Sequence, residues 1–203
     1  MKNKFQKLPI DFYLRNDVVQ VSKDLLGKFL ITNIDGIKTG GMITELEAYN
    51  GIVDKASHAF SGRRTARTET MYSKGGIAYV YLCYGIHHLF NVVTNEKENP
   101  HAVLIRAIEP IIGIDEMIKR RKKETVQPNL TSGPGSMSAA LGIKVSDSGI
   151  DLTGNIIFIE DRNILITEKN IVSTKRIGVD YAGKDALLYY RFYIKGNKYI
   201  SKP

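Results

Sequence analysis

Two glutamates, a tyrosine and a histidine stand close together in the sequence and could form an acid–base site. Glu45 and Glu47 alternate along a largely apolar stretch that ends at Tyr49, and His58 follows nine residues later. If this stretch is a strand, both carboxylates and the tyrosine share one face. A positioned carboxylate can act as a general base. The alternative is a pair of surface acids that bind nearby lysines.

The same alternation predicts which face of this strand is buried. Ile43 is expected on the face that carries the glutamates, whereas Leu46 and Ala48 are expected on the opposite face, toward the core. The strand would then separate the hydrophobic core from the candidate site.

A second group of aromatic residues lies in the run from Ala78 to Tyr84. Tyr79 and Tyr81 are expected to share one face of a strand, and Tyr84 precedes a flexible glycine at the tip of a hairpin. An exposed aromatic ring at such a tip is suited to insertion into a base stack. A tyrosine-rich strand can equally be part of a core. The single cysteine, Cys83, excludes an internal disulfide and a multi-cysteine zinc site.

Several motifs, taken together and in order, resemble the alkyladenine (3-methyladenine) DNA glycosylase family. The similarity extends from about Asp17 to Ser201. It is carried by Glu45–Tyr49, His58, Tyr79–Gly85, Asn91, Leu104–Pro110, Ser132–Gly135, Arg176–Val179 and Arg191–Gly196. The resemblance implies a monofunctional base-excision-repair enzyme that flips a damaged purine out of duplex DNA and hydrolyses its N-glycosidic bond. The substrates would be 3-methyladenine, 7-methylguanine, hypoxanthine or ethenoadenine, and the product an abasic site.

The resemblance also implies roles for individual residues. Glu47 would be the general base, and Arg106 and the backbone carbonyl of Ile177 would hold the attacking water. The flipped base would lie between Tyr49 and His58 on one side and Tyr81 on the other. Asn91 would crowd the exocyclic amino group of normal guanine, and Tyr84 would fill the gap left by the base. The residues implied in contacts with the DNA backbone are Arg63, Arg64, Thr65 and Arg67.

Alkylation makes the base a good leaving group, so the hydrolysis that the resemblance implies needs no metal and no other cofactor. Two other functions remain open from the residues alone. A metal-dependent hydrolase could use Glu45, Glu47, Asp54 and His58 as ligands. A non-enzymatic nucleic-acid-binding domain could use the basic surface and exposed tyrosines.

Composition sets broad limits that agree with these options. The chain has 203 residues and a formal net charge of +8, with 43% hydrophobic and 25% charged residues. This length fits one domain, and the charge favours a polyanionic partner such as double-stranded DNA. We expect a monomer that binds no membrane, in a bacterial-type cytoplasm or, in a eukaryote, the nucleus.

Local patterns predict an α+β fold. Asp17 begins a short helix that ends near Gly27, because it is a capping residue followed by helical apolar spacing. A second, charged helix is expected at residues 115–124, and the expected strands are 28–34, 37–49, 78–84, 89–94, 102–108, 156–160, 174–179 and 188–194. With the family resemblance, these elements imply one compact domain over residues 1–203. A curved, mostly antiparallel sheet would be flanked by helices, a protruding hairpin would insert into DNA, and residues 1–15 would form a loosely ordered extension.

Overall fold

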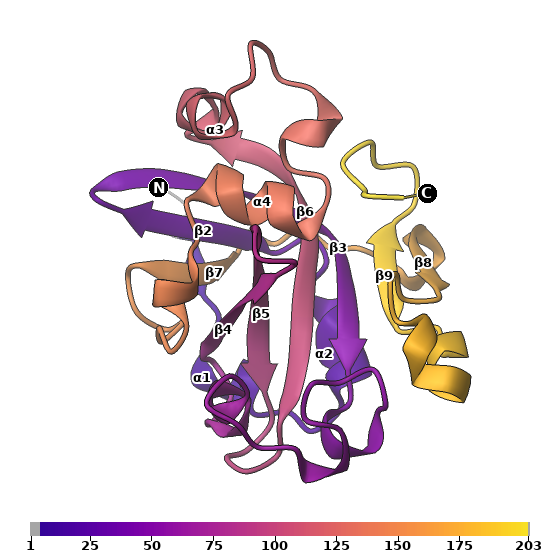
Figure 1. Cartoon of the computed structure of the whole chain (residues 1–203). Coiled ribbons are helices and arrows are strands. Elements are labelled where there is room, and N and C mark those ends of the chain that lie inside the picture. The colour runs from indigo at the N-terminus through magenta and orange to yellow at the C-terminus, as the bar shows by residue number, and fades with distance from the viewer. Residues whose placement is uncertain (1–4, 203) are drawn as a thin grey trace.

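A curled antiparallel sheet organises the chain, as Figure 1 shows. The structure is a computed structural model that describes residues 5–202. The strands are β1 (Gln6–Lys7), β2 (Phe29–Ile34), β3 (Ile37–Tyr49), β4 (Ala78–Cys83), β5 (His87–Thr94), β6 (His101–Ile112), β7 (Ile157–Asp161), β8 (Ile171–Thr174) and β9 (Arg191–Ile194). They follow the order β1-β7-β2-β3-β6-β5-β4, and β9 pairs with both β3 and β8. The prediction of one compact α+β domain is confirmed.

Short helices pack around this sheet. The α-helices are α1 (Ile10–Tyr13), α2 (Val18–Leu25), α3 (Ile114–Arg121) and α4 (Pro134–Leu141). The 3₁₀ helices are η1 (Gly51–Val53), η2 (Phe60–Gly62), η3 (Glu69–Tyr72), η4 (Pro128–Leu130), η5 (Val145–Asp147), η6 (Glu168–Asn170) and η7 (Asp180–Leu187). The predicted cap of α2 is confirmed, because the Asp17 side chain accepts a hydrogen bond from the backbone N–H of Gln20.

One face of the sheet is covered by the main hydrophobic core. Leu46 of β3 and Ile105 of β6 are fully buried there together with Leu25 of α2 and Leu141 of α4. Since these side chains occupy one face of the two long central strands, the neighbouring residues on the opposite face are available for a site.

The face of β3 changes at a bulge. Ile43 pairs with Ile108 of β6, but Glu45 pairs with the next residue, Ala107, so Thr44 is an extra residue in the ladder. Ile43 consequently lies in the same core cluster as Leu46. The expectation that Ile43 shares the face of the glutamates is therefore wrong, because the bulge interrupts the strict alternation on which it relied.

Two further expectations differ from the structure. Residues 5–15 are not a loose extension, because β1 pairs with β7 and the Tyr13 side chain is fully buried. Residues 1–4 lie outside the described part of the chain.

Residues 174–179 do not form a strand. Strand β8 ends at Thr174, and an irregular segment that contains Arg176 crosses toward the end of β3. Within residues 5–202, every helix is too short or too polar to cross a bilayer.

Candidate active site

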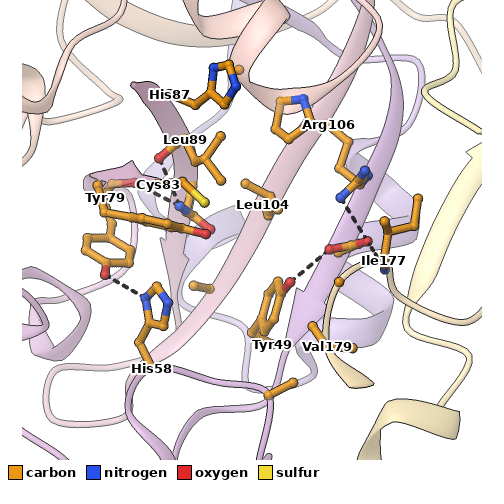
Figure 2. A pocket seen from close by; sticks show the side chains of 18 of the residues that line it. Tyr49, His58, Tyr79, Cys83, His87, Leu89, Leu104, Arg106, Ile177 and Val179 are labelled. Atoms are coloured by element: carbon orange, nitrogen blue, oxygen red, sulfur yellow. Dashed lines mark hydrogen bonds and ion pairs between the residues drawn. The ribbon is translucent and has the colours of Figure 1, made fainter. Parts of the chain in front are cut away.

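A pocket with a volume of about 610 Å³ opens on the face of the sheet opposite the core. It is lined by residues from β3, β4, β5 and β6, by the first turn of α4, and by the irregular segment at residues 177–179. Figure 2 shows side chains from these separate segments pointing into one space. The lining residues used below are Glu47, Tyr49, His58, Arg67, Tyr79, Tyr81, Tyr84, Asn91, Arg106 and Ile177.

The carboxylate of Glu47 is held by donors on both oxygens. Its Oε1 accepts the backbone N–H of Ile177 at 2.8 Å and lies 3.1 Å from Nη1 of Arg106. Its Oε2 accepts the hydroxyl of Tyr49 at 2.8 Å. The side chain is fully buried, and each contact is one that an anionic carboxylate makes. Glu47 is thus a fixed anion at the edge of the pocket.

Glu45 takes a different position, although it precedes Glu47 by only two residues. Its Oε1 accepts Nε of Arg191 at 2.7 Å and Nε of Arg106 at 2.9 Å. Whereas Glu47 lines the pocket, Glu45 is turned to a buried ion-pair network beside it. The two glutamates are therefore not equivalent, and Arg106 connects them.

Aromatic rings form the walls of the pocket. The ring centroids of His58 and Tyr81 are 4.6 Å apart, and those of Tyr79 and Tyr81 are 5.5 Å apart. In Figure 2, Tyr49 lies apart from His58 and Tyr79, beside the ion pair of Arg106. His58 therefore belongs to the wall of Tyr81 rather than to that of Tyr49. The expected grouping is corrected because the hydroxyl of Tyr79 lies 2.9 Å from Nδ1 of His58 and ties that ring to β4.

The environment keeps His58 uncharged. Burial, together with the smaller effect of the positive charges of Arg67 and Arg63, lowers its pKa from 6.5 to about 4. Burial also raises the pKa of Tyr81 and of Tyr49, so both phenols stay neutral near pH 7. The aromatic side chains of His58, Tyr81 and Tyr49 in the pocket lining are thus neutral.

Asn91 lines the pocket from β5 and is almost completely buried. Its Nδ2 donates to the backbone carbonyls of Tyr79 at 3.1 Å and of Leu89 at 3.2 Å. Because both amide hydrogens are directed at the backbone, Oδ1 is the amide atom that remains for a ligand.

The four residues considered as metal ligands do not converge. The Asp54 carboxylate is bound by Arg176, with Nη2 at 2.8 Å from Oδ1, while Glu45 and Glu47 contact other donors. Among residues 5–202, no cluster of three His, Cys, Asp or Glu side chains has the geometry of a metal site.

Comparison with known proteins gives a consistent result. Residues 11–198 match the family model described as methylpurine-DNA glycosylase. The chain belongs to the methylpurine-DNA glycosylase family. Its relatives include proteins named "Putative 3-methyladenine DNA glycosylase". The protein from Clostridium perfringens (strain 13 / Type A) is 45% identical over 97% of this chain and 99% of the relative. The protein from Chlamydia felis is 47% identical over 94% of this chain and 97% of the relative. A third, from Clostridium acetobutylicum, is 46% identical over 96% of this chain and 97% of the relative.

In this family member, the hairpin of β4 and β5 ends at the rim of the pocket. Tyr84 is 89% exposed and adopts a positive φ of 51°, and the turn is closed by a hydrogen bond from the N–H of Ile86 to the carbonyl of Cys83. Gly85 also has a positive φ, which glycine adopts without strain. The turn therefore presents the Tyr84 ring to solvent beside the pocket.

The four basic and hydroxyl residues after His58 have different surroundings. Arg64 is paired with Glu69 and Glu98, and the hydroxyl of Thr65 lies 3.2 Å from that of Thr68. The Arg67 guanidinium lies 4.8 Å from the centre of the Tyr81 ring, inside the pocket lining. Arg63 is exposed.

Arg176 belongs to one of the matching motifs but was not predicted as a site residue of this glycosylase. Its guanidinium binds Asp54, donates to the carbonyl of Ala48 at 2.9 Å, and lies 4.8 Å from the centre of the Tyr49 ring. It thereby fixes the segment that brings the N–H of Ile177 to Glu47. The available signal was its position as the first residue of the motif Arg176–Val179.

Proposed function

We propose that this protein is a monofunctional DNA glycosylase that hydrolyses the N-glycosidic bond of an alkylated purine flipped out of duplex DNA. Membership of the family supports the reaction class. The observation that carries the proposal is the Glu47 carboxylate, held by Arg106 and the Ile177 N–H at the edge of an aromatic pocket.

The contacts of Glu47 support a role in activating a water molecule. Oε1 already receives two charge-assisted contacts, whereas Oε2 receives the hydroxyl of Tyr49. Oε2 is therefore the oxygen with capacity to take a proton from water. The water oxygen forms a bond to C1′, the C1′–N bond breaks, and the base leaves with the bonding electrons. The water proton passes to Glu47, whose negative charge also stabilises the positive charge that develops on the sugar.

The walls of the pocket favour a cationic base. A purine methylated at N3 or N7 carries a positive charge in the nucleoside and leaves as a neutral base. Arg176 lies over one face of the Tyr49 ring and Arg67 over one face of the Tyr81 ring, and the other electron-rich face of each ring would attract such a cation. Neutral His58 adds an aromatic surface without charge repulsion, since its pKa is lowered to about 4 by burial and by Arg67 and Arg63. A charged imidazole at this position would oppose binding of the alkylated base.

The same arrangement supports the remaining parts of the proposal. The exposed ring of Tyr84 would occupy the gap in the duplex, and the exposed side chains of Arg63 and Arg67 would contact phosphates. Asn91 Oδ1 would lie near the flipped base. There it would repel lone pairs on the edge of an unsuitable purine, or crowd the exocyclic amino group of normal guanine. The described residues that line the pocket include no lysine, so an imine with the sugar is not expected and the strand should stay intact.

The proposal is tested by Glu47→Gln, which keeps the shape of the side chain and removes the base. Release of free base from methylated duplex should fall roughly 10²–10⁴-fold, because general-base catalysis and the negative charge are both lost. Binding to the damaged duplex should persist. The measurement is single-turnover release of 3-methyladenine and 7-methylguanine, with inosine-containing and ethenoadenine-containing duplexes in parallel.

Glu124→Gln is the matched control, since Glu124 lies exposed in the loop after α3. It should release base at the wild-type rate. The proposal is overturned if Glu47→Gln keeps full activity, if wild-type protein binds methylated duplex without releasing base, or if release stops when a chelator removes divalent ions. Strand cleavage without added alkali would refute only the monofunctional part.

A further inference from the structure

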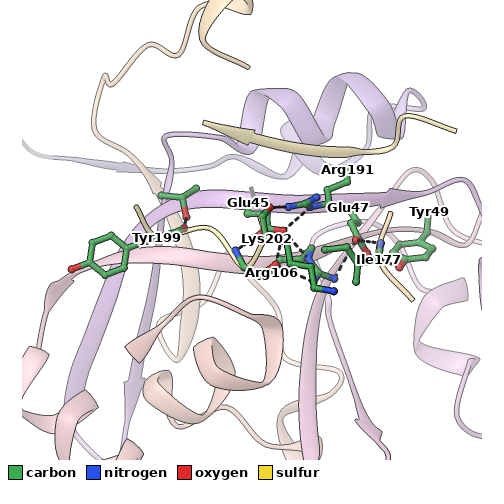
Figure 3. Close-up of polar contacts among 10 residues, drawn as sticks. Glu45, Glu47, Tyr49, Arg106, Ile177, Arg191, Tyr199 and Lys202 are labelled. Atoms are coloured by element: carbon green, nitrogen blue, oxygen red, sulfur yellow. Dashed lines mark hydrogen bonds and ion pairs between the residues drawn. The ribbon is translucent and has the colours of Figure 1, made fainter. Parts of the chain in front are cut away.

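The C-terminal segment from Asn197 to Lys202 contacts the ion-pair network beside the pocket (Figure 3). The hydroxyl of Ser201 donates to Oε1 of Glu45 at 2.8 Å and accepts Nη2 of Arg106 at 3.1 Å. The backbone N–H of Ser201 donates to Oε2 of the same glutamate. Ser201 thus binds both the glutamate and the arginine of the network.

The arginine at the centre of this network is fixed on every edge of its guanidinium. Nε of Arg106 binds Glu45 at 2.9 Å, Nη1 lies 3.1 Å from Glu47, and Nη2 binds Ser201 at 3.1 Å. Arg106 is itself the extra residue where β6 shifts register against β3, since Ala107 pairs with Glu45 and Ile105 pairs with Leu46. A bulge at this point directs the side chain between the two glutamates.

The charges in the network balance. Glu45 and Glu47 are fully buried, and the side chains of Arg106 and Arg191 are 8% and 5% exposed. Buried charges need partners with defined geometry, because water cannot replace a lost one. Glu45 therefore restrains Arg106, and the position of Arg106 in turn restrains Glu47.

The segment itself is anchored at both ends. Tyr199 is buried, and its carbonyl accepts the hydroxyl of Thr44, the bulge residue of β3. Asn197 donates to Glu109 of β6 at 2.9 Å, and the carbonyl of Lys202 accepts Nη2 of Arg191. The place of Ser201 is therefore defined by contacts with β3, β6 and β9.

We propose that Ser201 and Glu45 are positioning residues for the glycosylase reaction, and that the C-terminal segment is part of the active site. Ser201 holds the guanidinium of Arg106 at the angle at which Nη1 reaches Glu47 Oε1. Oε2 of Glu47 then stays directed toward the attacking water. Neither positioning residue touches the substrate, and the inference rests on the proposed function of Glu47.

The test uses the full chain with Ser201→Ala and Ser201→Thr. Ser201→Ala removes the hydroxyl that binds Arg106, so the single-turnover rate of base release should fall roughly tenfold. Affinity for methylated duplex should stay near the wild-type value, whereas the midpoint of thermal unfolding should fall by roughly 2–4 °C, because two buried charges lose a partner. Ser201→Thr keeps the hydroxyl and should restore most of the rate. Ser173→Ala on β8 is the matched control, because Ser173 is exposed and should leave the rate unchanged.

A second variant tests the other positioning residue. Glu45→Gln keeps the shape but leaves Arg106 and Arg191 without their shared anion, so the rate should fall about 100-fold, more than for Ser201→Ala. Its affinity for methylated duplex is measured beside the rate, and preserved binding identifies a folded protein.

The outcomes separate this inference from the proposed function. If wild-type protein releases base and Ser201→Ala does so at the same rate, only the role of Ser201 is refuted. Equal losses of rate, affinity and unfolding temperature, without rescue by Ser201→Thr, would show a merely structural role and overturn the inference. A wild-type protein that releases no base would instead refute the proposed function.

Discussion

The donors around Glu47 and the pKa of His58 show how single residues define the chemistry of the pocket. Glu47 is restrained by contacts from three different parts of the chain, Arg106, Ile177 and Tyr49. His58 is kept neutral by burial and by two nearby arginines. An anion and a neutral aromatic surface thus stand in one pocket, which is the combination suited to a cationic base.

A pH dependence of stability follows from His58. Its pKa is about 4 in the folded protein, below the ordinary 6.5, so the unfolded chain binds more protons between these values. The stability that depends on neutral His58 should therefore be complete above pH 6.5, and the free energy of unfolding should fall as the pH drops toward 4. Comparing urea unfolding at neutral pH and near pH 4.5, His58→Asn should lose about 2 kcal/mol less than the wild type. Identical losses in both proteins would contradict this assignment.

At the scale of elements, the pairing of β3 with β6 carries side chains of both strands into the pocket lining. A Cβ atom on Gly41 would lie 2.1 Å from the carbonyl oxygen of Glu109, so the two backbones can approach only at a glycine. The register shifts that follow along β3 place Thr44 and Arg106 outside the regular pairing. The orientation of the side chains that line the pocket therefore depends on local irregularities of the two longest strands.

Gly41→Ala should separate these strands and destabilise the protein by about 3 kcal/mol or more, because the clash is with backbone. Gly36→Ala in the turn between β2 and β3 is the control. It meets no atom within 4 Å and should cost only about 1 kcal/mol through its positive φ. Chemical denaturation of both variants measures the difference. Equal costs would show that the strands can move apart freely at Gly41.

The hairpin tip belongs to the same scale. Tyr84→Ala should lower the rate of base release from duplex DNA by about tenfold or more, since no ring would fill the gap that the flipped base leaves in the duplex. Release from a damaged base that is already unpaired should change less. The unfolding temperature should not change, because the ring is 89% exposed. Base release from paired and unpaired substrates of the same sequence measures the effect, and equal losses on both would count against a wedge.

At the scale of the whole molecule, net charge and its distribution determine how the protein meets DNA. The formal charge is +8, which attracts a polyanion over a long range. Individual arginines should contribute unequally, because Arg64 is paired with two carboxylates whereas Arg63 is exposed. Affinity for undamaged duplex should therefore fall with salt, and the arginines should differ in their share of that dependence.

Arg63→Ala should reduce the steepness of log affinity against log salt concentration by about 0.9, the value for one phosphate contact. Arg64→Ala should change it less, because Glu69 and Glu98 already neutralise its guanidinium. Fluorescence anisotropy at several salt concentrations gives both slopes. A larger change for Arg64→Ala would show that its carboxylate pairs open when DNA binds.

Local sequence patterns determined much of the fold. Asp17 caps α2 as predicted, Asp35 and Gly36 join β2 and β3, and Glu47 and Tyr49 share one face, because these features depend on neighbours a few residues apart. The motifs were also sufficient to identify the family that the comparison then confirmed.

Only the tertiary structure decided how the site is assembled. Because of the bulge at Thr44, Ile43 lies in the core. The hydroxyl of Tyr79 holds His58 next to Tyr81, and Ser201, near the C-terminus, binds Glu45. These outcomes depend on strand register and on contacts between distant segments. Periodicity describes which way a side chain faces within one element, but it contains no information about which other element it will meet.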